Sequence, residues 1–131
     1  MAATFTFELV TPERLLLSQP AEQVVVPGSE GDFAVLPGHA PVISTLRPGV
    51  IEITLPQGRQ RIFVKKGVAE ADPERLTVLA QTAVPVEDLD AGRLSAELKA
   101  AETELAEAKD DQSKRMGEML ADVLRRLQVK A

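Results

Sequence analysis

The sequence predicts an α+β fold, in which an N-terminal antiparallel β-sandwich of about eight to ten short strands precedes a C-terminal antiparallel two-helix hairpin. Two observations predict it. Turn-forming Pro and Gly residues recur every 6 to 11 residues or so before residue 86, which is typical of short strands in a sandwich or barrel. All nine prolines and all four phenylalanines lie at or before Pro85. We therefore expect a sandwich domain over residues 1–85 and a helical domain over residues 86–131.

Short β-forming runs lie between the turns of the first part. Apolar and polar residues alternate in two of them: Phe5, Phe7 and Leu9 enclose Thr6 and Glu8, and Ile51, Ile53 and Leu55 enclose Glu52 and Thr54. The other runs span residues 24–26, 33–36, 42–43, 62–64 and 76–79. Because successive side chains of a strand point to opposite faces, one face of each run can join a shared core.

The last part of the chain has the apolar spacing of two helices. Apolar residues follow one another at steps of three and four in two series: Leu94, Leu98, Ala101, Leu105 and Ala108, then Met116, Leu120, Val123 and Leu127. Asp88 or Asp90 is placed to cap the first helix, and the segment 110–113 offers a cap for the second. A link that short makes the helices antiparallel neighbours. Since both apolar stripes are narrow, the hairpin should be only marginally stable when detached.

Charge is divided unevenly between the two predicted helices. Residues 86–112 carry nine acidic and three basic side chains, net -6, whereas residues 113–131 carry two acidic and five basic side chains, net +3. Opposite charges on neighbouring helices favour the closed hairpin, although an exposed ion pair contributes less than about 1 kcal/mol. The same basic helix is also suited to an acidic surface on another protein.

Composition excludes several classes of function. The net charge of -5 argues against nucleic-acid binding, and the lack of cysteine excludes disulfides and thiolate sites. His39 is the sole histidine, so we interpret it as a turn residue with a polar or interface contact, and expect no metal site and no enzyme. No signal peptide is evident and no apolar run approaches about 20 residues, so we expect a cytoplasmic chain that meets membranes only through protein partners.

Three stretches of the sequence resemble the epsilon subunit of bacterial F-type ATP synthases. They are residues 26–41 (VPGSEGDFAVLPGHAP), residues 46–51 (LRPGVI) and residues 67–83, and the helical hairpin after Leu89-Asp90 follows in the same order. The resemblance covers nearly the whole chain. It implies a non-catalytic rotor subunit whose sandwich docks on the gamma subunit and on the polar loops of the membrane ring during proton-driven ATP synthesis. It also implies a peripheral position at the cytoplasmic face of the inner membrane.

The resemblance assigns roles by position within the sandwich. Glu30, Gly31 and Asp32 would lie in the loop that faces the ring. His39, Ala40, Pro41 and Val42 would lie towards gamma. Without the resemblance, Glu30 and Asp32 are equally well explained as a solvated acidic turn.

Two regulatory features of the family concern the hairpin. Some members bind ATP through a Leu-Asp-x-x-Arg-Ala motif aided by arginines of the second helix, which here are Arg125 and Arg126. This chain reads LDAGRL over residues 89–94, so Asp90 and Arg93 match, but a leucine replaces the alanine, and Asp90 could simply cap the helix. No other cofactor is expected.

The second feature is inhibition, in which an extended second helix enters the catalytic head of alpha and beta subunits. Its basic residues then face an acidic segment of beta. The candidates for that contact are Arg115, Arg125, Arg126 and Lys130. A helix of at most about 18 residues would reach roughly 27 Å, and Gly117 would weaken its first turn.

Two other functions fit the same sequence. A free-standing adaptor would use the sandwich for recognition and the hairpin to bind a different acidic partner. An ATP-sensing module would compact its hairpin when it binds the nucleotide, through Arg93. The adaptor would have no affinity for stalk components of the synthase, and the sensor would lose its response in Arg93→Ala.

Overall fold

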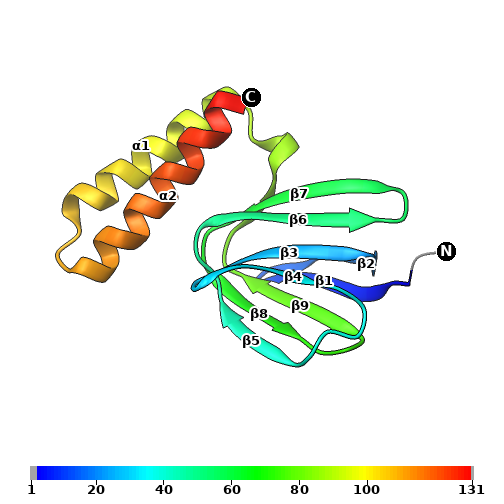
Figure 1. Ribbon diagram of the computed structural model, residues 1–131. Helices are drawn as coiled ribbons and strands as arrows, with labels where there is room; N and C mark the ends of the chain where they lie inside the picture. The colour runs from blue at the N-terminus through cyan, green and yellow to red at the C-terminus, as the bar shows by residue number, and fades with distance from the viewer. Residues whose placement is uncertain (1–2, 131) are drawn as a thin grey trace. The chain divides into compact units, whose positions relative to one another are not determined.

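The computed structural model describes residues 3–130, with backbone alone for residues 129 and 130. It confirms the predicted fold class: two packed sheets of strands precede two helices that pack together (Figure 1). Contacts divide the chain into two compact units that meet between Pro85 and Val86. Each unit is described below by itself.

The first unit contains ten strands in two sheets. The strands are β1 (Phe5–Thr11), β2 (Arg14–Ala21), β3 (Gln23–Gly28), β4 (Gly31–Val35), β5 (Val42–Thr45), β6 (Gly49–Leu55), β7 (Gly58–Val64), β8 (Gly67–Ala71), β9 (Arg75–Ala80) and β10 (Ala83–Pro85). One sheet has the order β2-β1-β9-β8-β5, and the other has the order β10-β7-β6-β3-β4. Hairpins join β1 to β2, β3 to β4, β6 to β7 and β8 to β9.

One strand pair departs from the predicted antiparallel arrangement. β1 pairs with β9 in parallel, with Phe7 opposite Leu76 and Leu9 opposite Val78. The other pairs between described strands are antiparallel. The alternation of side chains identifies a strand but not its neighbour, and β1 and β9 are joined only through the rest of the sandwich.

The core lies between the two sheets and is built from alternate residues of the strands. Phe7 and Leu9 of β1 are fully buried, whereas Thr6 and Glu8 between them are half-buried. The opposite sheet contributes buried residues with the same spacing, such as Val24 and Val26 of β3 and Ile51 and Ile53 of β6. The alternating runs of the sequence therefore become the two inner faces of the sandwich.

Three strands had no counterpart among the runs picked from the sequence. β2 contains three successive leucines, Leu15 to Leu17, which show no alternation. β8 has the composition GVAEA, with small residues on its buried side, and β10 has only three residues. The β-propensity of these three segments is weak. They form strands because neighbouring strands pair with them.

The second unit is an antiparallel hairpin of α1 (Ala91–Glu107) and α2 (Asp111–Lys130), preceded by the short 3₁₀ helix η1 (Val86–Asp88) (Figure 1). Both predicted caps are present. The Asp90 carboxylate accepts a hydrogen bond from the Arg93 N–H at 2.8 Å, and the Asp110 carboxylate accepts one from the Ser113 N–H at 2.7 Å. α2 has 20 residues rather than the 18 or fewer expected, because the helix begins directly after its cap.

The buried stripe of α2 is displaced from the one that the sequence predicted. Ala121, Leu124 and Leu127 are buried, whereas Met116, Leu120 and Val123 of the predicted stripe are only half-buried. Small residues explain the shift. A Cβ added to Gly117 would lie 3.3 Å from the Leu105 Cβ, so α1 approaches α2 closely at a position that the sequence had marked only as a weak point.

We expect two leucine-to-alanine changes on β9 to separate the buried face of the sandwich from its outer face. Leu76→Ala should lower the free energy of unfolding by about 2 to 5 kcal/mol, because Leu76 is fully buried. Leu79→Ala should cost less than about 1 kcal/mol, since Leu79 is 51% exposed. Urea denaturation of the full chain measures both, and equal losses would contradict the assignment of faces.

Candidate docking surfaces

The turn between β3 and β4 carries two acidic residues at an exposed hairpin end. We call residues 29–32 the acidic tip. Its four residues Ser29, Glu30, Gly31 and Asp32 are exposed, and Gly28 pairs with Gly31 at the end of the strand ladder. Gly31 has φ +139°, a value that favours glycine. The structure therefore brings the three predicted ring-facing residues together on one turn.

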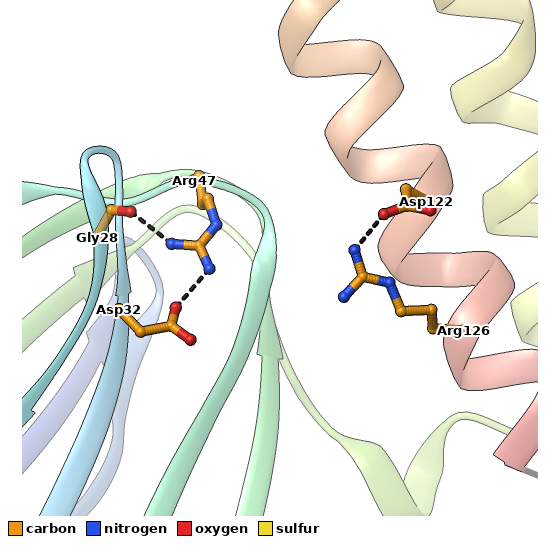
Figure 2. Close-up of polar contacts among 5 residues, drawn as sticks. All are labelled: Gly28, Asp32, Arg47, Asp122 and Arg126. Atoms are coloured by element: carbon orange, nitrogen blue, oxygen red, sulfur yellow. Dashed lines mark hydrogen bonds and ion pairs between the residues drawn. The ribbon is translucent and has the colours of Figure 1, made fainter.

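Arg47, between β5 and β6, fastens this hairpin to the next part of the chain (Figure 2). Its Nη1 donates a hydrogen bond to the Gly28 carbonyl oxygen at 2.6 Å, and its Nη2 pairs with Asp32 Oδ1. We call this arrangement the Arg47 clasp. The Arg47 side chain is 28% exposed and that of Asp32 is 59% exposed. Sequence reasoning missed the clasp, since Arg47 and Asp32 are 15 positions apart.

Backbone and hydroxyl contacts reinforce the clasp. The Ser29 N–H donates to the Thr45 carbonyl oxygen at 2.8 Å, and the two hydroxyl groups of Ser29 and Thr45 lie 2.7 Å apart. The Arg47 N–H donates to the Pro27 carbonyl oxygen at 3.0 Å. A Cβ added to Gly49 would lie 2.8 Å from the Pro27 Cβ, so the two segments approach too closely there for any other residue. Glu30 takes part in none of the ion pairs formed within residues 3–130.

The four residues assigned towards gamma form a continuous segment after β4. The His39 N–H donates to the Leu36 carbonyl oxygen at 3.1 Å, and the Gly38 N–H donates to the Pro73 carbonyl oxygen at 2.8 Å. The His39 ring nitrogen Nδ1 lies 2.6 Å from the Ala40 carbonyl oxygen. Ala40 and Pro41 are exposed, and Val42 begins β5 and packs against the core. The half-buried His39 thus makes the local polar contact expected of a turn residue.

Next to this segment, the outer face of the β2-β1-β9-β8-β5 sheet carries exposed apolar side chains. Val68 of β8 lies opposite Leu79 of β9, and Leu79 lies opposite Val10 of β1. Val10 in turn lies opposite Leu15 of β2. Val68 is 36% exposed, Leu79 51%, Leu15 54%, and Ile43 on the edge strand β5 71%. We call Ile43, Val68 and Leu79 the apolar face.

The sequence did not reveal the apolar face. Its residues lie on three strands, and only Ile43 and Leu79 belong to β-forming runs picked from the sequence, whereas Val68 belongs to none. Only the register of the sheet shows that they point outward together. Exposed apolar side chains that gather in this way are typical of a protein-binding surface.

The hairpin residues assigned to nucleotide binding or inhibition are not gathered at one site. Arg125 forms a 3.0 Å ion pair with Glu102 of α1, and Arg126 pairs with Asp122 one turn earlier (Figure 2). No hydrogen bond or ion pair within the described residues joins Asp90 or Arg93 to either arginine. The Asp90 carboxylate instead caps α1.

Arg115 and Lys130 complete the predicted basic set. Arg115 is exposed near the start of α2, ten residues and about 15 Å along the helix from Arg125. The side chain of Lys130 lies outside the described residues. Arg115 thus lies near one end of α2 and Arg125 and Arg126 lie towards the other, and of these three only Arg125 forms an ion pair with α1 within the described residues.

Metal-ligating side chains are not gathered in the described part of the chain. Within residues 3–130, no group of three or more His, Cys, Asp or Glu side chains could hold a metal ion. Among the same residues, no helix has the length and apolar character needed to cross a membrane.

Comparison with known proteins identifies the family. The family model described as "ATP synthase, Delta/Epsilon chain, beta-sandwich domain" matches residues 4–86. The ATP synthase epsilon chain of Parvibaculum lavamentivorans is 49% identical over 128 residues, covering 97% of each chain. The chain belongs to the ATP synthase epsilon chain family. The epsilon chain of Rhodospirillum rubrum is 50% identical over 116 residues, covering 87% of this chain and 86% of its relative.

Solved structures share the fold of this epsilon chain at lower identity. A chain in the mitochondrial ATP synthase of Euglena gracilis, in an assembly with OSCP, F1 and the c-ring, has a TM-score of 0.76 at 22% identity, covering 99% of this chain and 82% of that one. A chain from the central stalk and c-ring of the Tetrahymena thermophila enzyme has a TM-score of 0.72 at 9% identity, covering 97% and 98%.

Membership of the epsilon chain family confirms the resemblance seen in the sequence. The chain is an epsilon chain, a non-catalytic subunit of an F-type ATP synthase. It therefore belongs to a peripheral part of a membrane-bound complex.

We expect acidification to weaken the start of α2 through Asp110. The Ser113 backbone N–H, and then its hydroxyl, lower the pKa of Asp110 below its ordinary value of 3.8 because they favour the ionised carboxylate. The stabilisation is thus fully present above pH 3.8 or so and is lost as the pH falls through the lower pKa of the folded chain.

Carboxyl NMR shifts give this pKa directly, and circular dichroism follows the helix between pH 7 and pH 2 or so. Asp110→Asn is the matched control, because asparagine caps helices without titrating. The natural chain should lose more helical signal in acid than Asp110→Asn does. An Asp110 pKa at or above 3.8 would contradict the assigned hydrogen bonds.

Proposed function

We propose that the sandwich attaches this epsilon chain to the rotor through two surfaces, with the acidic tip against the polar loops of the membrane ring and the segment 39–42 towards gamma. The chain would thereby help the central stalk to turn as one body at the cytoplasmic face of the bacterial inner membrane. The observation that carries the proposal is that both surfaces belong to one packed sandwich.

The apolar face supports the attachment to gamma. Ile43 directly follows Val42 and is 71% exposed, and Val68 and Leu79 extend the exposed apolar surface across two further strands. Covering these side chains would remove apolar area from water, which is favourable by about 25 cal/mol per Å². Val42 packs inward against the core and holds β5 in place, and β5 carries the exposed Ile43.

The acidic tip supports the attachment to the ring. It is exposed, and Glu30 has no ion-pair partner within the described part of the chain. A carboxylate in that position favours a partner with basic or hydrogen-bond-donating side chains. The tip is also tied to the sandwich by Arg47 and by Ser29, so a force on it passes into the folded unit rather than bending a loose loop.

We further propose that the hairpin regulates ATP hydrolysis by presenting its basic residues to the catalytic head. In the closed hairpin Arg125 is paired with Glu102, and the Gln128 side chain lies 3.4 Å from the Ser95 hydroxyl. Opening the hairpin would release Arg125 for an acidic segment of the beta subunit. Arg115 and Arg126 would join that contact without any interhelical pair being broken, since Arg126 pairs within its own helix.

The attachment to gamma predicts that a charge on the apolar face weakens binding. Ile43→Lys should reduce the affinity of the chain for gamma at least about tenfold, because binding would then remove the charged ammonium group of the lysine from water. Gln57→Lys is the matched control, since it adds the same charge at the exposed turn between β6 and β7. Titration calorimetry with purified gamma measures both, and equal effects of the two changes would refute the assignment.

The regulatory role predicts a difference between the full chain and a version that ends at Pro85. Both should bind a catalytic head that contains gamma, but only the full chain should slow its ATP hydrolysis, because α2 carries the basic residues. Equal rates with both versions would show a coupling element without inhibition. If neither version bound, the rotor role would fail and an adaptor role would replace it.

A separate measurement, the compaction of the isolated chain with and without ATP, addresses ATP binding by the hairpin. The carboxylate of Asp90, which a nucleotide site would need, caps α1, so we expect ATP to leave the compaction of the hairpin unchanged. Arg93→Ala is the matched variant. ATP-dependent compaction of the natural chain that disappears in Arg93→Ala would instead support the sensing function.

A further inference from the structure

The Arg47 clasp joins both strands of the β3–β4 hairpin with one side chain. Gly28 is the last residue of β3, and Asp32 is the second residue of β4. The guanidinium contacts the carbonyl oxygen of the first and the carboxylate of the second (Figure 2). It therefore bridges the hairpin immediately behind the acidic tip, and it does so from a segment that belongs to neither strand.

We propose that Arg47 is the positioning residue of the acidic tip: its clasp holds both strands of the tip in place and compensates the charge of Asp32, so that Glu30 presents the one uncompensated carboxylate. This inference deepens the proposed contact with the ring and rests on it. The two acidic residues then have different roles. Asp32 shapes the tip, and Glu30 meets the partner.

The chemistry of arginine suits this role. A guanidinium is planar and presents several N–H donors in a fixed fork, so it can serve a carbonyl oxygen and a carboxylate at once without rearranging. Its donors stay charged at any physiological pH. The hydrogen bond from Arg47 to the Gly28 carbonyl oxygen is partly buried, where a charge-assisted bond is stronger than at a fully exposed position, whereas the ion pair with Asp32 is exposed.

Fixing the tip in advance favours binding. A turn that becomes ordered only on contact loses conformational entropy at that moment, whereas a turn already held by the clasp does not. The Ser29–Thr45 contacts hold the same turn through uncharged groups. They give a local probe, because the Ser29 N–H is hydrogen-bonded only while the tip lies against the end of β5.

The first test measures amide hydrogen exchange at Ser29 in the full chain. Arg47→Met keeps the length and apolar stem of the side chain and should speed exchange at Ser29 about tenfold, the effect of losing a charge-assisted hydrogen bond. Arg61→Met is the matched control, because it removes another arginine ion pair, with Glu52 at 3.8 Å, elsewhere on the sandwich. It should leave Ser29 unchanged. Unchanged exchange in Arg47→Met would overturn the inference.

Conservative variants keep the test valid if Arg47→Met destabilises the whole sandwich. Asp32→Asn removes the ionic half of the clasp and keeps the bond to Gly28, so it should speed exchange at Ser29 less than Arg47→Met does. Arg47→Lys keeps the charge but not the forked set of donors, so exchange at Ser29 should again be faster than in the natural chain and slower than in Arg47→Met. Exchange at buried core amides reports global unfolding separately, and a rise there equal to the rise at Ser29 would count against a local role.

The second test measures function in the assembled ATP synthase in vesicles, as proton pumping driven by ATP hydrolysis. Glu30→Gln and Arg47→Met should both reduce pumping while hydrolysis continues, and Arg61→Met should not. If Glu30→Gln reduces pumping and Arg47→Met does not, the positioning role is wrong although the ring-facing role stands. If neither variant reduces pumping while Ser29 exchange responds to Arg47→Met, the proposed ring contact itself fails.

Discussion

Burial of alternate side chains between two sheets is the constraint on which the rest of the sandwich depends. Phe7, Leu9, Ile51, Ile53 and Leu76 are fully or almost fully buried and lie on strands from both sheets. Once these side chains face inward, the intervening residues of the same strands must face outward. The exposed positions of Val68 and Leu79 follow directly, because Ala69 and Val78 occupy the inner face beside them.

The core therefore determines which side chains face outward, and these side chains form the surfaces proposed for docking. The apolar face exists because Ile43, Val68 and Leu79 occupy outward positions of β5, β8 and β9, beside polar outward residues such as Glu70 and Thr77. The acidic tip lies at the end of a hairpin whose strands are held by the same core. A subunit without catalytic groups can then transmit force, because its contact surfaces are rigidly joined through packed side chains.

The helical hairpin is held together by different contacts from those of the sandwich. Its contacts combine buried leucines, such as Leu94 and Leu124, with the close approach of Gly117 to Leu105 and an exposed ion pair between Arg125 and Glu102. Exposed ion pairs contribute little, and this buried stripe has fewer side chains than the core of the sandwich, so less free energy holds the hairpin closed than holds the sandwich together. An element of this kind can change partner at low cost, whereas the sandwich cannot.

The sequence alone determined the fold class, the runs with strict alternation and both helices, and it limited each helix cap to a few neighbouring residues, because each of these depends on residues close together in the chain. Phe5 to Leu9, Ile51 to Leu55, Asp90 and Asp110 are of this kind. The motifs shared with other epsilon chains added the family, and with it the expected roles of Glu30, Asp32 and His39.

Only the tertiary structure decided which strands are neighbours and which side chains meet. The parallel pairing of β1 with β9, the alignment of Val68 with Leu79 and the clasp between Arg47 and Asp32 all join residues that the sequence leaves unrelated. The buried stripe of α2 shifted for the same reason, since the close approach at Gly117 depends on where α1 lies. Periodicity fixes the faces of an element, whereas its contacts depend on the neighbours that packing places against those faces.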